Sequence, residues 1–206
     1  MAKRSIDISL KKQAKQQRSI ATVTAIVEAA TYILRREGPS GFTANKVAER
    51  AGVNIASYYQ YFPNKQALLF HIAQATWGQQ LDKLTSILTR VGPDHAAKFR
   101  EFIHEFFKIE AKEAELRQAL RIASVDLKDT AEFQALITQG AILTRNFLAQ
   151  ALQIDDANDL DFIVQFMVTL ITSFAERTTD EGVVGDQLVR QADVLADMLI
   201  AHFGIS

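Results

Sequence analysis

The side chains best suited to binding chemistry gather between residues 42 and 65, in the run FTANKVAERAGVNIASYYQYFPNK. Hydroxyl, amide, phenol and ammonium groups crowd this run, and such groups hydrogen-bond to DNA phosphates and base edges. The spacing predicts a short helix, a glycine turn, a second short helix and a stop at Pro63. This pattern is a helix-turn-helix over about residues 42–62, which places its second helix in a DNA major groove.

Local signals position these short helices. Thr43 stands where an N-cap belongs, and Gly52 supplies the left-handed residue that ends the first helix. Asn54 or Ser57 can cap the second helix, and Asn64 offers a cap for the helix that follows the proline. An apolar stripe over residues 19–37 predicts a supporting helix ahead of them. Together these elements predict a DNA-binding domain over residues 19–65.

Enzyme and metal chemistry find no support in the sequence. The chain has no cysteine, and its four histidines show no His-Glu-x-x-His spacing. No glycine-rich phosphate loop and no nucleophile elbow occur. We therefore expect no catalytic residue, no metal and no cofactor, and the chain is not expected to be an enzyme.

Charge is divided unevenly along the 206 residues, although the formal net charge is only −1. Residues 1–65 hold 11 Lys and Arg against four Asp and Glu, and residues 66–206 hold 12 against 20. The basic third can neutralise phosphates, whereas the acidic remainder is expected to face away from DNA. The alternative is a merely solvated asymmetry. Residues 1–18 form a basic arm that either lies along DNA or is a disordered solubilising tail.

Hydrophobic periodicity predicts an all-α chain of about nine helices without a sheet. After the N-terminal helices, helical patterns cover residues 65–89, 94–112, 113–126, 130–153, 157–179 and 185–203. The first of these is long enough to belong to two domains, and residues 66–206 are expected to form the second domain. No apolar run of about 18 residues and no secretory signal occur, so a cytoplasmic location without a membrane partner is expected.

The N-terminal residues resemble the tetracycline-repressor (TetR/AcrR) family of bacterial transcriptional regulators. The resemblance rests on Phe-Thr-x-x-x-Val-Ala-x-x-Ala-Gly-Val and then Tyr-Tyr-x-Tyr-Phe-Pro-Asn-Lys-x-x-Leu-Leu, within residues 19–70. It implies a homodimer on a palindromic double-stranded DNA operator, with a C-terminal helical domain that dimerises and binds a small-molecule effector. The function so implied is a ligand-responsive regulator, most simply a repressor. The alternative is a helical lipid or small-molecule carrier or interaction scaffold without DNA function.

The resemblance also implies roles for individual residues. Thr43 would touch a phosphate, and Tyr59, Tyr61 and Lys65 would bind phosphates near the second short helix. Gln60 could read a base, because a glutamine side chain suits adenine. The expected DNA-binding residues are Thr43, Asn54, Ile55, Ala56, Ser57, Tyr59, Gln60, Tyr61 and Lys65.

Individual positions refine this prediction. Ile55 and Ala56 depart from the residues common in the family there, and either could contact a thymine methyl. Tyr58 is expected to point inward and to join a small core, whereas an outward position is expected for Tyr59 and Tyr61.

The Phe-rich helices between residues 94 and 152 admit two interpretations. Phe99, Phe102 and Phe106 share one helical stripe, which ordinary core packing explains in full. The alternative is an apolar effector pocket with a few polar anchors, suited to an aromatic, fatty or multidrug-type molecule. Its expected lining is Trp77, Phe99, Phe102, His104, Phe106, Arg121, Asp126 and Phe147, with Arg145 as a further candidate anchor.

The last two helices carry more apolar residues than one modest bundle needs to bury. Paired with a second copy of the chain, they predict a four-helix bundle at a homodimer interface. The expected interface residues are Phe162, Phe166, Leu170, Phe174, Leu188, Leu195 and Leu199. The alternative is that all of them fill the core of one chain.

Overall fold

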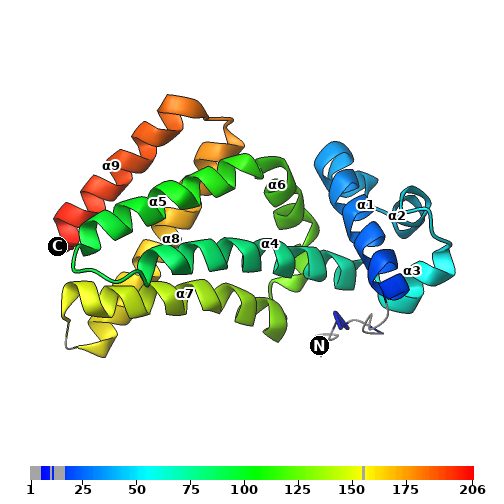
Figure 1. Ribbon diagram of the computed structural model, residues 1–206, viewed down its shortest axis with the longest axis horizontal. Helices are drawn as coiled ribbons and strands as arrows, with labels where there is room; N and C mark the ends of the chain where they lie inside the picture. Colours follow the sequence, from blue (N-terminus) through cyan, green and yellow to red (C-terminus); the bar gives the residue numbers. More distant parts are fainter. Residues whose placement is uncertain (1–5, 10, 12–16, 155) are drawn as a thin grey trace. The chain divides into compact units, whose positions relative to one another are not determined.

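The computed structural model describes residues 6–9, 11, 17–154 and 156–206 (Figure 1). Over these residues the chain is all-α, as predicted, with nine α-helices, one 3₁₀ helix and no strand. The helices are α1 Gln17–Gly41, α2 Ala44–Arg50, α3 Ile55–Tyr61, α4 Lys65–Leu88, α5 His95–Lys112, α6 Ala114–Ala123, η1 Val125–Leu127, α7 Ala131–Leu152, α8 Ala157–Asp180 and α9 Gly185–Phe203. None of the helices in the described ranges is long and apolar enough to cross a membrane. Most of the basic arm expected over residues 1–18, namely residues 1–5, 10 and 12–16, lies outside the described part.

Helix boundaries follow the breakers and caps in the sequence. Gly38 adopts a left-handed φ of 66° and interrupts α1 where a stop was predicted, and Pro39 then begins one more turn. Asp94 caps α5 by accepting a hydrogen bond from the backbone N–H of Ala97 at 2.7 Å. Asp156 caps α8 in the same way. These short-range signals explain why the predicted helix ranges lie within a few residues of the observed ones.

The chain divides into two compact units. The first unit is formed by residues 1–76 and 115–134, and the second by residues 77–114 and 135–206. This division differs from the expected single boundary after Lys65. The first part of α4, up to Thr76, belongs to the first unit, and the rest of α4 belongs to the second. One continuous helix is therefore shared by the unit that contains α2 and α3 and by the unit that contains α5, α8 and α9.

The core of the first unit includes residues of α1, α2, α3 and α4, and Val47 of α2 has no exposed surface. Its largest fully buried side chains include Ile26 and Ile33 on α1, Tyr58 on α3, Phe62 directly after it, and Leu68 on α4. Burial of side chains of this size stabilises a fold by about 1.5–3 kcal/mol each. The two short helices are therefore held by apolar packing against longer ones.

The core of the second unit centres on α5, which packs against both α8 and α9. Phe99 is fully buried, and its ring stacks on Phe102 at 6.1 Å and on Phe147 of α7 at 5.9 Å between ring centroids. At the surface, the Arg100 guanidinium donates to the Asp197 carboxylate at 2.6 Å and joins α5 to α9. The Phe-rich stripe predicted for residues 94–112 is thus the centre of a packed core.

Gly52, in the turn between α2 and α3, needs a left-handed φ, and a glycine inside α4 serves as its control. Gly52 has a φ of 66°, and a Cβ added there would meet no atom within 4 Å, so Gly52→Ala should cost about 1–3 kcal/mol through backbone strain alone. Gly78 lies inside α4 with equally open space, so Gly78→Ala should stabilise by about 0.5–1 kcal/mol. Urea unfolding of both variants measures the difference, and shifts of the same sign would contradict this assignment.

Candidate nucleic-acid interface

The ends of α2 and α3 are fixed by side-chain caps. The Thr43 hydroxyl accepts a hydrogen bond from the backbone N–H of Lys46 at 3.3 Å, which confirms the predicted N-cap of α2. Asn54, rather than Ser57, caps α3, because the Asn54 Oδ1 accepts from the Ser57 N–H at 2.7 Å. The left-handed Gly52 between the helices is also as predicted. The helix-turn-helix geometry is thus set by short-range hydrogen bonds.

One face of α3 is anchored in the core. The Tyr58 and Phe62 side chains are fully buried, as the inward position predicted for Tyr58 requires, and their ring centroids lie 6.1 Å apart. The Phe62 ring meets the His71 ring of α4 edge-on at 5.7 Å. Burial lowers the pKa of His71 and favours its neutral form. The anchoring of α3 therefore uses ring packing without a charge.

The structure corrects the position expected for Tyr61. We expected its phenol to be exposed beside that of Tyr59, but the Tyr61 side chain is only 5% exposed. Tyr58 and Tyr61 are three residues apart and share one face of α3, whereas Tyr59 lies about 100° around the helix. The Tyr59 side chain is 44% exposed. Burial of Tyr61 weighs against the phosphate contact carried over to it.

The opposite face of α3 is open to solvent. Ile55 is 38% exposed, and Ala56 and Gln60 are exposed as well, whereas Ser57 is half-buried. The predicted positions exposed around this face are Thr43, Asn54, Ile55, Ala56, Tyr59, Gln60 and Lys65. Polar, apolar and cationic groups therefore occur on one short capped segment, as direct base reading and phosphate binding both require.

A contact that sequence reasoning missed joins the N-terminus to the end of α3. The Asn64 Oδ1 caps α4 by accepting from the Ala67 N–H at 2.7 Å, as predicted, and the Asn64 Nδ2 donates to the Asp7 carbonyl at 2.8 Å. The Lys11 N–H donates to the Tyr61 carbonyl at 3.0 Å. No local pattern indicates the pairing of Asn64 with Asp7 or of Lys11 with Tyr61, because the partners lie far apart in the sequence.

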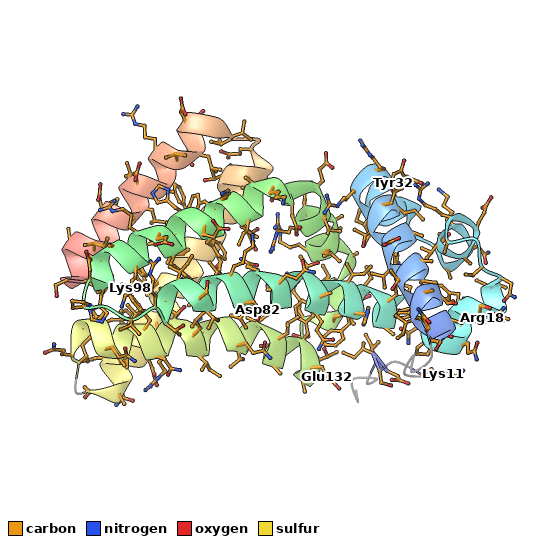
Figure 2. All side chains as sticks on the ribbon, viewed as in Figure 1. Lys11, Arg18, Tyr32, Asp82, Lys98 and Glu132 are labelled. Carbon is orange, nitrogen blue, oxygen red and sulfur yellow. The ribbon has the colours of Figure 1, made fainter. Side chains whose placement is uncertain are left out.

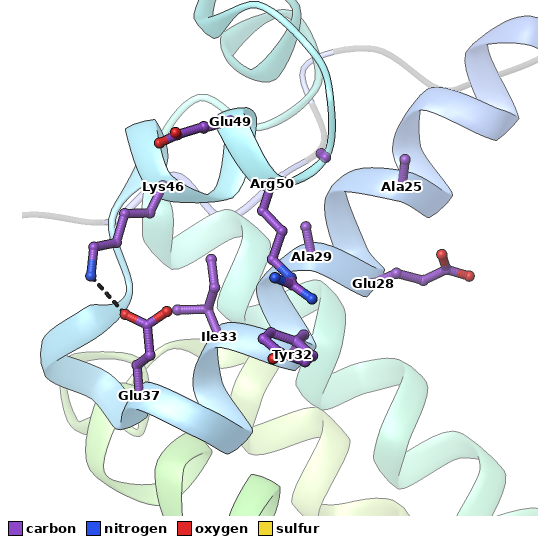
Figure 3. Close-up of a pocket in the computed structure, with 10 residues that line it drawn as sticks. Ala25, Glu28, Ala29, Tyr32, Ile33, Glu37, Lys46, Glu49 and Arg50 are labelled. Atoms are coloured by element: carbon purple, nitrogen blue, oxygen red, sulfur yellow. Dashed lines mark hydrogen bonds and ion pairs between the residues drawn. The ribbon is translucent and has the colours of Figure 1, made fainter.

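A hollow of about 820 Å³ opens between α1 and α2 (Figure 3). Lys46 Nζ lies 2.6 Å from Glu37 Oε2 across it, and the Arg50 guanidinium carbon lies 3.2 Å from the centre of the Tyr32 ring. Both contacts fasten α2 to α1, and their exposure keeps each one worth about 1 kcal/mol or less. The hollow carries charges of both signs, because Glu28, Glu37 and Glu49 line it together with Lys46 and Arg50.

The residues expected to line an effector pocket are divided between the two units. Trp77, Phe99, Phe102, His104, Phe106 and Phe147 belong to the second unit, and Arg121 and Asp126 to the first. Phe99, Phe102 and Phe147 are buried and stacked, as core packing predicts. His104 pairs with Asp193 at 2.9 Å, and Arg145 with Asp161 at 2.6 Å. Both candidate anchors therefore already contact carboxylates of their own chain.

One polar group in the second unit was not predicted. The Gln80 side chain is 5% exposed, and its Oε1 has no hydrogen-bond partner among the described residues. Gln80 lies one turn before Leu84 on α4, and Leu84 belongs to the same core as Phe99 and Phe102. A buried amide oxygen without a partner is costly, which makes Gln80 an unusual residue in this core.

The residues expected at a homodimer interface also divide into two groups. On α8, Phe162, Phe166 and Phe174 are 69%, 46% and 37% exposed, and Leu170 is half-buried. On α9, by contrast, the expected residues Leu188, Leu195 and Leu199 are buried in the core of their own chain, which corrects their assignment to an open surface. They share one helical stripe that faces the chain's own core, and the exposed apolar residues of α9 are Val189, Val194 and Met198.

The buried phenol of Tyr58 gives a test of how α3 is anchored. Its hydroxyl has no hydrogen-bond partner in the described part of the chain, and burial raises the pKa of Tyr58 above its ordinary value of 10.0. At pH values below 10.0, the ordinary pKa, the folded and unfolded chains both carry the neutral phenol. Above it the unfolded chain loses the proton first, so stability falls as the pH rises.

We therefore expect Tyr58→Phe to be close to neutral or stabilising at neutral pH and to lose less stability than wild type at about pH 11. Urea unfolding at both pH values measures the effect. Tyr59→Phe, which alters an exposed phenol, is the matched control. An equal alkaline loss in Tyr58→Phe and wild type would contradict the burial of an unpartnered hydroxyl.

Known proteins share parts of this sequence and this fold. Residues 26–72 match the family model for bacterial regulatory proteins of the tetR family. The transcriptional regulator FadR from Bacillus subtilis, in complex with stearoyl-CoA, is 17% identical at a TM-score of 0.70, over 86% of this chain and 97% of its own. SmeT, the repressor of the Stenotrophomonas maltophilia multidrug efflux pump SmeDEF, is 19% identical at a TM-score of 0.69, over 89% and 92%. SmeT is also known in complex with triclosan.

A TetR family transcription regulator from Marinobacter aquaeolei VT8 is 24% identical at a TM-score of 0.65, over 89% of this chain and 97% of its own. A comparison with curated proteins finds no match. The matched segment runs from α1 into α4 and includes both capped helices. The helix-turn-helix domain of this chain belongs to the tetR family of bacterial regulatory proteins, and the chain as a whole has the fold of that family's regulators.

Proposed function

We propose that the chain is a homodimeric, ligand-responsive DNA-binding regulator that represses transcription in the cytoplasm. The observation that carries the proposal is α3, a seven-residue helix capped by Asn54, buried on its Tyr58 face and exposed on the other. A helix presented in this way fits the major groove with its N-terminal residues toward base edges. The basic charge of residues 1–65 favours the same partner.

Several of the expected interface residues have a proposed role in DNA binding. Thr43 and Tyr59 hydrogen-bond to phosphates, and Lys65 binds a phosphate at the start of α4, where the helix dipole also favours an anion. Ser57 and Gln60 read base edges, and Ile55 and Ala56 lie against base methyl groups. Phosphate contacts supply affinity on every sequence, whereas base contacts choose the operator.

The effector is proposed to be a molecule with a long or aromatic apolar part. The solved structures of similar fold bind stearoyl-CoA in one case and triclosan in another. In this chain the second unit is rich in phenylalanine, and the unpartnered Gln80 Oε1 supplies a polar group beside that core. An apolar lining with few polar groups is usual for sites that bind such molecules.

The link between effector and DNA is proposed to be α4. This helix begins with Lys65 and carries Gln80 and Leu84 later along its length, so it belongs to both units. An effector changes DNA affinity only if it binds one arrangement of the DNA-binding domains more tightly than another. A rigid helix shared by both units is the element best placed to convert that preference into movement.

The homodimer is proposed to form through α8 and α9. Phe162 and Phe166 stack at 6.4 Å between ring centroids, and Phe166 meets Phe203 of α9 at 6.3 Å. Phe162 and Phe166 on α8 and Met198 on α9 are all exposed, so both helices present apolar side chains to solvent. A second copy would cover these side chains and would present two recognition helices about 34–36 Å apart on a palindromic site.

A carrier or scaffold without DNA function is the rival proposal. It would explain the Phe-rich core of the second unit but would give no role to the exposed face of α3. The two proposals differ in whether the purified chain binds duplex DNA with the salt dependence expected from phosphate contacts. Binding of an apolar molecule alone does not separate them.

Two substitutions should separate phosphate binding from base reading. Lys65→Gln should weaken binding to all duplexes alike and should make the slope of log affinity against log salt shallower by about 0.9 for each phosphate that the variant no longer neutralises. Gln60→Ala should weaken the preferred sequence by about 5-fold to 150-fold, with less effect on others, because one base contact is worth about 1–3 kcal/mol. Fluorescence anisotropy across a salt series measures both.

The matched control is Lys108→Gln, which removes the same charge from an exposed position on α5. It should leave both the affinity and the salt slope as in wild type. A wild-type chain that binds no duplex at low salt, or a Lys65→Gln variant that keeps the full slope, would contradict the proposal.

The dimer surface can be tested at Phe162, whose side chain is 69% exposed in one chain. Phe162→Ser should leave the fold of the single chain intact and weaken the dimer by about 30-fold or more, as for a central aromatic contact. Val91→Ser, at a loop position that is 99% exposed, is the control. Sedimentation across a concentration series measures the dissociation constant, and an unchanged value for Phe162→Ser would place the interface elsewhere.

A further inference from the structure

The segment before α1 is fastened to the first unit by several independent contacts. Ile8 is 6% exposed, so its side chain is buried. The carbonyl of Asp7 accepts from Asn64 Nδ2 at 2.8 Å, and the N–H of Lys11 donates to the carbonyl of Tyr61 at 3.0 Å. Asp7, Ile8, Ser9 and Lys11 are referred to below as the docked segment.

The docked segment has its own internal brace. The Asp7 carboxylate accepts hydrogen bonds from the Ser9 N–H at 3.1 Å and from the Ser9 hydroxyl at 2.6 Å. These bonds lower the pKa of Asp7, so the carboxylate stays charged and keeps its partners at neutral pH. A turn of this kind gives the chain a defined path over the end of α3.

The position of the docked segment fixes where its cation lies. Tyr61 is the last residue of α3, and its carbonyl is held directly by the Lys11 N–H, while the Lys11 side chain remains exposed. Figure 2 shows Lys11 and Arg18 on one side of the first unit. In a helix-turn-helix the start of the recognition helix meets base edges, so its other end lies toward the rim of the groove, where the phosphates run.

We propose that the docked segment is a second DNA-contacting element, in which Lys11 binds a phosphate at the rim of the groove read by α3. The inference rests on the proposed function, because it assumes that α3 enters the groove. Asn64 is the positioning residue: one amide group caps α4 and holds the segment against the end of α3. The competing explanation is that the segment only covers the junction between α3 and α4 and satisfies the Tyr61 carbonyl.

The experiment compares Lys11→Gln and Asn64→Ser with wild type on a duplex that the wild-type chain enriches from a random-sequence pool. Lys11→Gln keeps the backbone hydrogen bond to Tyr61 and removes only the ammonium. Asn64→Ser keeps a hydroxyl that can cap α4, but its side chain is too short to replace the amide donor to Asp7. Lys108→Gln is again the charge-matched control, and thermal unfolding checks that each variant is folded.

We expect Lys11→Gln to reduce the steepness of the salt slope by about 0.9 per protomer and to weaken binding similarly on all sequences. Asn64→Ser should produce the same change in slope, and the double variant should show no further change, because both substitutions remove one contact. If wild type binds normally and either single variant keeps an unchanged slope, this inference is overturned and the proposed function is unaffected. A wild-type chain that binds no duplex would instead overturn the proposed function.

Discussion

A helix of seven residues is too short to persist in water without support, and the stability of α3 depends on what surrounds it. The support is the burial of the Tyr58 and Phe62 rings, neither of which has exposed surface. Their packing is reinforced at both ends by amides, since Asn54 caps α3 and Asn64 caps α4. The exposed face of α3 is therefore held in one geometry before any partner binds, which lowers the ordering cost of binding.

The same support separates two kinds of residue on one helix. Residues on the Tyr58 face are committed to the core, and residues around Tyr59 and Gln60 remain free for a partner. The basic Lys11 and Lys65 lie on segments that directly adjoin the end of α3. Charge and burial thus favour the same surface for DNA.

Most helix positions were predictable because their ends are set by local chemistry. Thr43, Gly52 and Asn64 act within three or four residues of themselves, so their roles can be read from the sequence. Tyr61 was misplaced because a cluster of tyrosines shows no clear period, and only the helix geometry decides which ring is buried. The pairing of Asn64 with Asp7 was invisible, because it joins residues 57 positions apart.

Apolar stripes were the weakest guide to function. The α9 leucines have the spacing of an interface, but periodicity shows that a stripe is buried without showing by what. Leu195 and Leu199 are covered by their own chain, whereas Phe162 and Phe166 on α8 are not. Gln80 gave no signal at all, since a single polar residue in an apolar helix becomes informative only when its partners are known.

The most direct test of the central claim is hydrogen–deuterium exchange of the full chain with and without a duplex that it has enriched from a random-sequence pool. If α3 is the DNA-reading helix, the duplex should slow exchange over α2, α3 and the start of α4, and should leave the middle of α8 unchanged. Protection confined to α8 and α9, or no protection at a DNA concentration that saturates binding, would contradict it.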